Sequence, residues 1–323
     1  MIKTKLFPKN GTLKRQIKFI LNYGILAPSG HNSQPWIFVL NHNSVEIKPD
    51  FKYSRPSSDP SNRELYISLG SVATNISIAA DYFGLIYDKK YLVDPKTKQQ
   101  SILFTFKNGK KISANQELFE AIVNRATNRF DFQNKNIDKN IIKNVTKSNF
   151  PDVKFTLISS QKDKLKLSKL VYKSDLLWFH KNDLVNELIS WLRTDISAKK
   201  DGLPDNTFVK FKTDEQIIKK AHREAKLALT SPLSIIISSP TETIKNWIHV
   251  GEAFEYLALR LTTFGLSNGY FNNPIQLLTI LKKLNQEFKL KESAQLIIRV
   301  GYPTVTPPQS KRRPLVTFLQ DVS

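Results

Sequence analysis

The chain of 323 residues contains no cysteine and a single methionine. Without cysteine, the protein can form no disulfide bond, thiolate nucleophile, or cysteine-ligated zinc or iron–sulfur centre. The five histidines form neither an i, i+4 pair nor an H-E-x-x-H motif, so we expect no metal site. A serine nucleophile in a G-x-S-x-G turn is missing as well. Metal-dependent and nucleophilic hydrolysis are therefore disfavoured.

Long hydrophobic runs are also absent. No apolar stretch approaches the roughly 18 residues that a membrane-spanning helix requires. Near the N-terminus, the apolar residues 19–21 are followed by Asn22 and Gly24 before any small-residue cleavage site appears. We therefore expect a cytoplasmic protein with no signal peptide and no membrane contact.

Acidic residues are few compared with basic ones. The chain has 49 lysines and arginines against 28 aspartates and glutamates, which gives a formal charge of +21. Such an excess favours anionic partners, either nucleic acid or a phosphorylated ligand. The lysines are spread over nearly every segment, and neither a nucleic-acid recognition motif, a G-x-G-x-x-G motif nor a Walker motif occurs. We therefore expect solvated helix faces and no specific nucleic-acid surface.

Helical and strand patterns are mixed along the chain. Helices are predicted at 13–26, 64–83 with Gly84 as the C-terminal cap, 117–123, and most of 163–229 except an exposed loop at 198–213. Strands are predicted at 36–40, its hairpin partner 44–47, 101–106, 153–158, 232–237 and 296–300. This order indicates an α+β fold.

Two segments of the chain resemble each other. Residues 69–85 and 250–266 each contain a glycine near the start, Gly70 or Gly251, and each ends in Phe-Gly-Leu without a gap between. The spacing is far too long for a solenoid repeat. We predict two fused copies of one domain-sized unit, a half at 1–113 and a half at 114–323.

Residues 27–36 read Ala-Pro-Ser-Gly-His-Asn-Ser-Gln-Pro-Trp and connect a predicted helix to a predicted strand. Such a segment can be a plain connector built of turn-forming residues, or it can grip a flat polar heterocycle with its amides and hydroxyls. The pattern A-P-S-x-x-N-x-Q-P-W resembles a motif of the FMN-dependent nitroreductase superfamily. That resemblance implies that this loop borders a flavin ring.

Basic elements extend the resemblance. The segment 121–129 is similar to the family's A-I-x-x-R-x-S/T-x-R element, and Gly301-Tyr302-Pro303 followed by residues 311–314 resembles its closing G-Y-P and K-x-R elements. Arginine suits a phosphate because its rigid fork donates two parallel N–H groups. The resemblance implies that the flavin phosphate is held by Arg125, Thr127, Arg129, Lys311 and Arg313. A surface pair of basic residues at a helix end is the alternative for Arg125 and Arg129.

The two sets of elements lie in different halves, the loop in the first and the cations in the second. Family members are usually homodimers with flavin sites at the subunit interface. The resemblance thus implies a single-chain, monomeric pseudo-dimer with one FMN site and a second, degenerate site. From the loop it takes Pro28, Ser29, Gly30, Asn32 and Gln34 as ring contacts, and from residues 269–276 it takes Asn272 and Pro274.

The whole chain looks most like the tandem branch of that superfamily known from mycobacterial dormancy proteins. This implies a duplicated three-layer α-β-α sandwich and NAD(P)H-dependent reduction of nitroaromatics, quinones or similar acceptors. The flavin then supplies the chemistry, so no catalytic side chain is expected. Residues 175–229 are the candidate lid, and a flavin-sequestering protein with a covered FMN is the alternative. Replacing Arg125 and Arg313 together is expected to release FMN and leave the fold intact.

Overall fold

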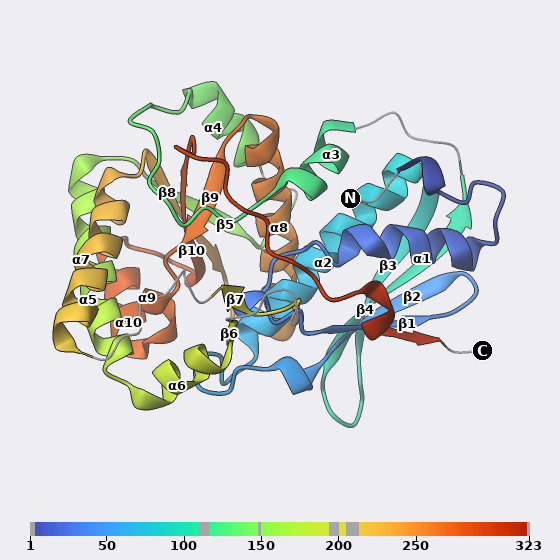
Figure 1. The fold of residues 1–323 in the computed structure, drawn as a ribbon, viewed down its shortest axis with the longest axis horizontal. Helices are drawn as coiled ribbons and strands as arrows, with labels where there is room; N and C mark the ends of the chain where they lie inside the picture. Colours follow the sequence, from blue (N-terminus) through green and yellow to red (C-terminus); the bar gives the residue numbers. More distant parts are fainter. Residues whose placement is uncertain (1–3, 110–115, 148–149, 194–199, 205–212, 322–323) are drawn as a thin grey trace.

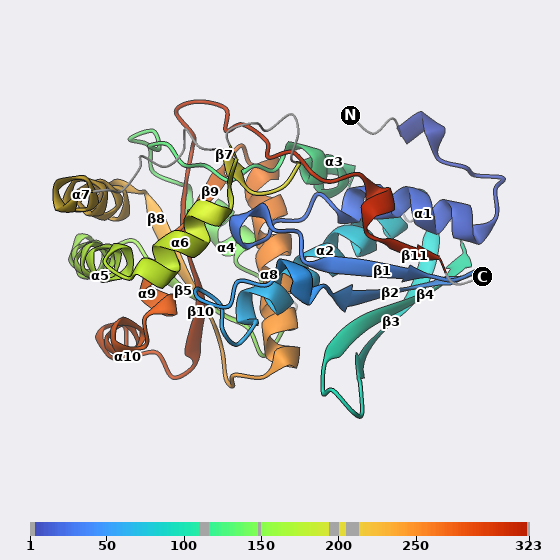
Figure 2. The same ribbon diagram turned by 60° about the horizontal axis from the view of Figure 1, so that its bottom comes forward.

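The computed structural model describes residues 4–109, 116–147, 150–193, 200–204 and 213–321. Two β-sheets lie on opposite sides of a central pair of helices, α2 (Arg63–Phe83) and α8 (Ile244–Thr263) (Figures 1 and 2). Helix α2 is close to the predicted range 64–83, and α8 contains most of the second copy of the repeat, 250–266. Gly84 has a φ of 77° and ends α2 as predicted, because glycine adopts the left-handed conformation without a steric penalty.

The first sheet has the strand order β11-β1-β2-β4-β3. Its strands are β1 (Trp36–Leu40), β2 (Ser44–Pro49), β3 (Leu85–Val93), β4 (Gln100–Asn108) and β11 (Leu319–Asp321). The predicted hairpin of β1 and β2 is confirmed, and α1 (Leu13–Gly24) packs with α2 on one face of the sheet. Burial alternates along β1, as expected for a sheet with only one face covered.

The strand β3 was not predicted. Charged residues and tyrosines occupy its middle, and buried or half-buried positions alternate with exposed ones along most of it. This strand is an edge of the sheet and pairs only with β4. Edge strands commonly carry charged residues, so the hydrophobic pattern that marks a strand in sequence is weak here.

The second sheet has the order β5-β8-β10-β9. Its strands are β5 (Lys154–Ile158), β8 (Leu233–Ser239), β10 (Ser293–Gly301) and β9 (Ser267–Tyr270). The strands β5, β8 and β10 confirm predicted strands, whereas β9 was not predicted. All seven residues of β8 are buried. A strand buried on both faces implies helices on both sides, and α8 and the outer helices form these layers (Figure 2).

The helices of the second half complete this arrangement. They are α3 (Gln116–Asn124), α4 (Lys139–Val145), α5 (Gln161–Phe179), α6 (Asn182–Ser190), α7 (Asp214–Thr230), α9 (Asn273–Gln276) and α10 (Leu278–Glu287). The short strands β6 (Leu192–Arg193) and β7 (Leu203–Pro204) pair in parallel. Helices α5, α7 and α10 lie at the far end of the molecule from the first sheet (Figure 1). No helix in the described part of the chain has the length and apolar character that a membrane span needs.

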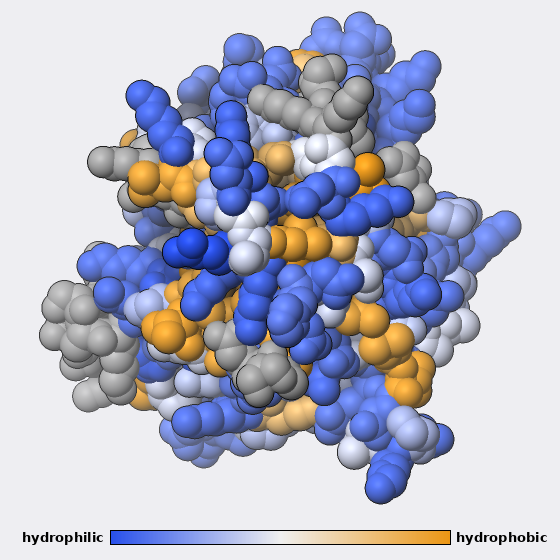
Figure 3. Space-filling view, turned by 90° about the vertical axis from the view of Figure 1, so that its right-hand side faces the viewer, coloured by the Kyte–Doolittle hydropathy of each residue, from blue (hydrophilic) through white to orange (hydrophobic). Residues whose placement is uncertain are grey.

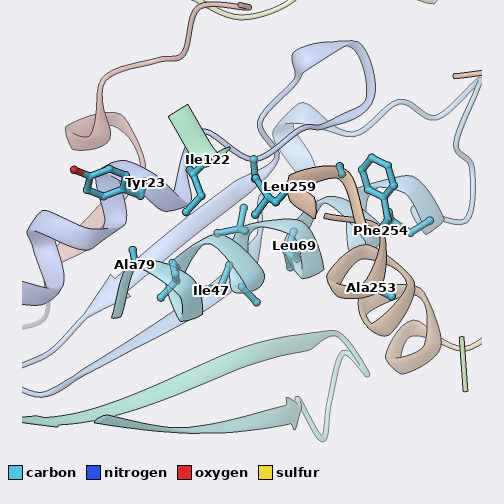
Figure 4. Packing of buried hydrophobic residues seen from close by; sticks show 14 of the residues in the cluster. Tyr23, Ile47, Leu69, Ala79, Ile122, Ala253, Phe254 and Leu259 are labelled. Carbon is cyan, nitrogen blue, oxygen red and sulfur yellow. The ribbon is translucent and has the colours of Figure 1, made fainter. Parts of the chain in front are cut away.

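The repeated helices meet at their glycines. A Cβ added to Gly251 would lie 1.9 Å from the carbonyl oxygen of Ile67, and one added to Gly70 would lie 2.0 Å from that of Ile248. The hydroxyl of Ser71 donates to the carbonyl of Gly251 at 3.2 Å. The two backbones therefore touch directly, which only glycine permits. Buried apolar residues from both halves, with Leu69, Phe254 and Leu259 among them, fill the core around this crossing (Figure 4).

The predicted boundary between the halves, at about residue 113, lies outside the described residues. The C-terminal strand β11 pairs in parallel with β1 of the first sheet. Residues 319–321 thus extend the sheet of the first half although they belong in sequence to the range 114–323. The tail that precedes them, including residues 311–314, runs from the second half back to the first (Figure 1). The face at the first-sheet end of the molecule is covered mostly by charged and polar residues (Figure 3).

Candidate functional site

The loop that joins α1 to β1 has an unusual backbone. His31, Asn32 and Gln34 have positive φ angles of 51°, 55° and 53°. The hydroxyl of Ser29 accepts a hydrogen bond from the backbone N–H of Gln34 at 2.9 Å and holds the turn. Left-handed residues other than glycine cost free energy and cluster at functional sites. A loop with three of them is a built feature and exceeds what a plain connector requires.

An ion pair supports this loop from below. A Cβ at Gly30 would lie 2.2 Å from Nη2 of Arg55, so the loop rests directly on that guanidinium. Nη2 of Arg55 is 2.6 Å from Oε2 of Glu64, and both side chains are buried. Burial alone would raise the pKa of Glu64, but Arg55 and Arg63 outweigh it and lower this pKa to about 2. The loop therefore rests on an arginine whose carboxylate partner stays ionised.

The same carboxylate connects the loop to the second half. Oε1 of Glu64 accepts from Nε2 of Gln276 in α9 at 2.9 Å, and Oε1 of Gln276 accepts from Nε1 of Trp178 at 2.8 Å. The predicted ring contacts Asn272 and Pro274 stand at the start of this short helix, where Asn272 is the N-cap and Pro274 is buried. The structure thus links α9 to the loop that carries the other predicted ring contacts.

Arg125 is buried and already has protein partners. Its Nη2 donates to the carbonyl of Leu26 at 2.8 Å, and its Nε lies 3.3 Å from Oε1 of Glu255, a carboxylate with no exposed surface. Arg312 donates to the carbonyls of Leu26 and Ala27 at 3.0 and 3.1 Å. Burial raises the pKa of Glu255, and Arg125 and Arg312 oppose that shift. Two arginines thus hold the chain where it enters the loop.

This environment disagrees with two sequence-based views of Arg125. The residue is not part of an exposed basic pair at a helix end, because only 7% of it is accessible. Replacing Arg125 would also remove a cationic partner of the buried Glu255 carboxylate, which lowers the free energy of unfolding. The expectation that removing Arg125 leaves the fold intact is therefore not supported by the structure.

Arg313 is likewise engaged with the loop. Its Nη2 donates to the carbonyls of Ser33 and Gln34 at 3.0 and 2.7 Å, and its guanidinium lies 3.7 Å from the ring centroid of Tyr53 and 4.6 Å from that of Phe318. Lys311 contributes its backbone carbonyl, which accepts from Nδ2 of Asn32 at 3.0 Å, while its side chain is exposed. Arg313 therefore shapes the loop.

Arg129 differs from the other cations. It is partly buried, and within the described ranges no hydrogen bond or ion pair involves its guanidinium. Burial lowers its pKa, which Tyr270 partly opposes. Thr127 lies close to it in sequence and forms a bridge with Asn268 at the start of β9. A partly buried arginine with no anionic partner among the described residues is suited to an anionic ligand.

The His31 imidazole is close enough to this cation to respond to it. Burial, together with Arg55 and Arg129, lowers the pKa of His31 to about 3 against the opposing effect of Glu64. The Nε2 atom of His31 is buried without a partner among the described residues, as are Oδ1 of Asn32 and Oδ1 of Asn272. These unpaired polar atoms come from both halves.

Part of the predicted lid is fastened to the loop. The side-chain amide of Asn32 donates to the carbonyl of Gly202 at 3.2 Å, and the backbone N–H of Gly202 donates to the carbonyl of Asn32 at 3.3 Å. The side-chain amide of Gln34 donates to the carbonyl of Lys200 at 3.0 Å. Nε of Arg193 lies 2.9 Å from Oδ1 of Asp201 and ties the segment to β6. The predicted loop at 198–213 and the predicted lid at 175–229 include residues 194–199 and 205–212, which lie outside the described residues.

A cleft of about 450 Å³ opens beside this region. Its walls are residues 54, 56 and 57 on one side and α6 with Trp191 and Arg193 on the other. None of the predicted cofactor contacts lines it. Glu187 of α6, which also lines the cleft, accepts from the backbone N–H groups of Ser57 and Ser58 at 2.8 and 3.0 Å.

The neutral state of the His31 imidazole predicts a pH dependence of stability. Between its ordinary pKa of 6.5 and its folded pKa of about 3, the unfolded chain binds a proton that the folded chain does not. This imidazole therefore lowers the free energy of unfolding as the pH falls below 6.5, by at most about 1.4 kcal/mol per pH unit. We expect His31→Gln to reduce the loss of stability between pH 6.5 and 4.5 by about 2 kcal/mol in urea titrations.

The matched control is His42→Gln, at an exposed histidine. The chosen pH window lies above the range in which Glu64 loses its stabilising charge, since its folded pKa is about 2 and its ordinary value is 4.5. Equal pH slopes for the native protein and His31→Gln would show that His31 is not held neutral.

Comparison with known proteins adds sequence and fold similarity. No protein-family model matches the chain. Two curated proteins from Mycobacterium tuberculosis, Uncharacterized protein MT3212 of strain CDC 1551 / Oshkosh and Uncharacterized protein Rv3127 of strain H37Rv, are each 23% identical to it over 322 residues. The alignment covers 91% of this chain and 90% of each of those proteins. The similarity thus extends along nearly the whole chain.

Several solved structures resemble part of the chain. The FMN-dependent nitroreductase NfnB from Mycobacterium smegmatis, in complex with NADPH, gives a TM-score of 0.44 at 14% identity and covers 62% of this chain and 96% of that one. A nitroreductase-like family protein from Bacillus cereus gives 0.43 at 14% identity, with coverage of 65% and 98%. A nitroreductase with bound FMN from Bacteroides fragilis gives 0.42 at 14% identity, with coverage of 62% and 95%. Each of these chains is similar to somewhat less than two-thirds of this protein.

Proposed function

We propose that the chain is a monomeric pseudo-dimer that binds one FMN non-covalently between its halves. On this proposal it uses the flavin to reduce nitroaromatics, quinones or similar acceptors with NADH or NADPH. The observation that carries the proposal is the Arg129 guanidinium, partly buried and unpaired within the described residues, beside a loop whose sequence matches a flavin-bordering motif. A cation with no anionic partner among the described residues can accept a phosphate as its partner.

The residues divide into those that would touch the cofactor and those that position them. Arg129, Thr127 and the Lys311 side chain would hold the phosphate. The backbone of the loop at Pro28, Ser29 and Gly30, with the unpaired oxygens of Asn32 and Asn272, would border the ring. When bound, FMN supplies the hydride chemistry, and the protein supplies orientation and a defined electrostatic environment.

Arg125, Arg313 and Gln34 act through other groups in this proposal. Arg125 holds the carbonyl of Leu26, and Arg313 holds those of Ser33 and Gln34. The side chain of Gln34 accepts from the backbone N–H of Arg313 at 3.0 Å. These contacts fix the loop in its left-handed conformation. The positive charge of Arg313 also favours an anion nearby, whereas that of Arg125 is offset by Glu255.

The contacts of residues 200–202 favour a second candidate, a flavin-sequestering protein. The amides of Asn32 and Gln34 are bonded to carbonyls of the lid segment, so the lid lies directly on the loop. A lid that stayed closed would keep NAD(P)H and acceptors from the ring. The proposed reductase requires this segment to open, whereas a storage protein requires it to remain closed.

Anaerobic mixing of FMN-loaded protein with NADPH separates the two candidates. Rapid loss of the flavin absorbance near 450 nm, on the order of seconds or faster for ordinary turnover, supports the reductase. A flavin that stays oxidised supports sequestration. Failure of the purified protein to bind FMN at all would remove both.

The lid can be loosened at a residue outside the proposed binding groups. Arg193→Met removes the ion pair with Asp201, a charge-assisted contact worth about 1.5 kcal/mol, so the open population should rise about tenfold. We expect the rate of flavin reduction in stopped-flow experiments to rise by a similar factor if lid opening limits it. The control is Arg260→Met, at a surface arginine of α8 that contacts Asn144. An unchanged rate in Arg193→Met would show that this contact does not hold the lid closed.

A further inference from the structure

Two arginines bind three consecutive peptide carbonyls around Arg129. Nη1 of Arg299 donates to the carbonyl of Phe130 and Nη2 donates to that of Asn128, both at 3.0 Å. Nη2 of Arg223, on α7, donates to the carbonyl of Arg129 itself at 3.0 Å. The carbonyls of the residues before and after Arg129 are therefore held by one guanidinium, and the carbonyl of Arg129 itself by another.

The position of Arg299 carries a desolvation penalty, because its charged side chain is buried. It stands on β10, only 2% of it is exposed, and within the described part of the chain no carboxylate forms a salt bridge with it. Burial lowers its pKa to about 10, so it remains charged at neutral pH. Its guanidinium lies 4.7 Å from the ring centroid of Phe132 and 5.9 Å from that of Phe271. Apolar residues of similar volume often replace buried charges without loss of stability, so the carbonyl contacts of Arg299 point to a role beyond packing.

The strand beside this segment is fitted to it closely. A Cβ at Gly269 of β9 would lie 2.4 Å from the carbonyl oxygen of Asn128 and 3.0 Å from Nε of Arg299. The backbone N–H of Asn128 donates to the carbonyl of Asn268 at 2.8 Å. The segment that carries Arg129 is thus locked to β9 on one side and to Arg299 on the other, which leaves its backbone one position.

We infer that Arg299, assisted by Arg223, is a positioning residue that preorganises Arg129 for a phosphate group and so makes the site select phosphorylated flavin over the unphosphorylated ring. The inference rests on the proposed function and adds the origin of its selectivity. A lysine cannot replace Arg299 in this role, because a single ammonium cannot span the carbonyls of Asn128 and Phe130 with the same fixed fork. Without the clamp, Arg129 would have to be ordered by the ligand, and the affinity would fall.

The test compares FMN with riboflavin, which has the same ring and lacks the phosphate. Dissociation constants for both are measured by flavin fluorescence on the native chain, Arg299→Lys, Arg299→Gln and Arg223→Gln, with Arg260→Gln as the matched control. We expect FMN binding to weaken about ten- to a hundredfold in the Arg299 variants and riboflavin binding to stay within about twofold. The control should retain native affinity for both.

Each outcome points to a different conclusion. Equal weakening for FMN and riboflavin, or no weakening, would overturn the positioning role while leaving flavin binding in place. If neither Arg299 variant folds, judged by circular dichroism and thermal unfolding, Arg223→Gln decides the question. It removes one carbonyl contact near the surface and should weaken FMN selectively by about fivefold. A native chain that binds neither compound would overturn the proposed function itself.

Discussion

Gly251→Ala is expected to lower the free energy of unfolding by about 3 kcal/mol or more, or to prevent folding. The added methyl group would lie 1.9 Å from the backbone oxygen of Ile67, and a backbone atom cannot move aside as the end of a side chain can. The helices α2 and α8 would have to separate along their contact. Chemical denaturation followed by circular dichroism measures the effect.

Gly265→Ala is the matched control for this substitution. Gly265 also has a special requirement, a φ of 70°, but nothing lies within 4 Å of the position that an added Cβ would take. Alanine there should cost about 1 to 2 kcal/mol, from backbone strain alone. A loss in Gly251→Ala no larger than that in Gly265→Ala would mean that the two helices do not touch at their glycines.

Arg125→Met is expected to destabilise the protein by about 3 kcal/mol. The substitution keeps most of the side-chain volume but leaves Glu255, which has no exposed surface, with Arg312 as its remaining cation nearby. A buried carboxylate that loses a partner becomes costly to keep charged. Thermal and urea unfolding of the apoprotein give the measurement without interference from cofactor binding.

A double variant separates charge from packing. Adding Glu255→Gln to Arg125→Met removes the buried charge and should restore about half or more of the lost stability. If the double variant is as unstable as the sum of the two single ones, the pair at 3.3 Å does not carry the coupling that the structure indicates. In that case Arg125 would be held in place mainly by the carbonyl of Leu26.

The sequence predicted the central helices because their patterns are strong. Each is long, contains a glycine, and ends at a residue that disfavours further helix. It did not predict that Gly70 and Gly251 face each other, since a repeat reports similarity and not contact. The strands β3 and β9 were not predicted from the sequence, because β3 is a charged edge strand and β9 has only four residues. Strand β11 has three residues and pairs with β1 far away in sequence, so no local pattern could place it.

The candidate site, like the fold, was predicted from the sequence only in part. Motif positions predicted segments that contact each other in the structure. They could not separate cations with protein partners from Arg129, whose guanidinium has no hydrogen bond or ion pair within the described ranges. Arg312 was passed over because the motif fixes its neighbours, although it holds the carbonyls of Leu26 and Ala27. Arg299 sits in a strand pattern and gave only a weak signal, a basic residue at a position that the apolar run predicts to be buried. A basic residue in a strand predicted to be buried is worth testing for hydrogen bonds that position other groups.

The stoichiometry of flavin binding tests the central claim most directly. The two halves differ, since only the second supplies Arg129 and only the first supplies the loop at 28–34. Titration of the apoprotein with FMN, followed by fluorescence or calorimetry and checked by the absorbance of the purified complex, should reach one equivalent per chain. Two equivalents would mean that each half builds its own site, and none would mean that the junction between the halves holds no flavin. Either result would contradict a single site shared by both halves.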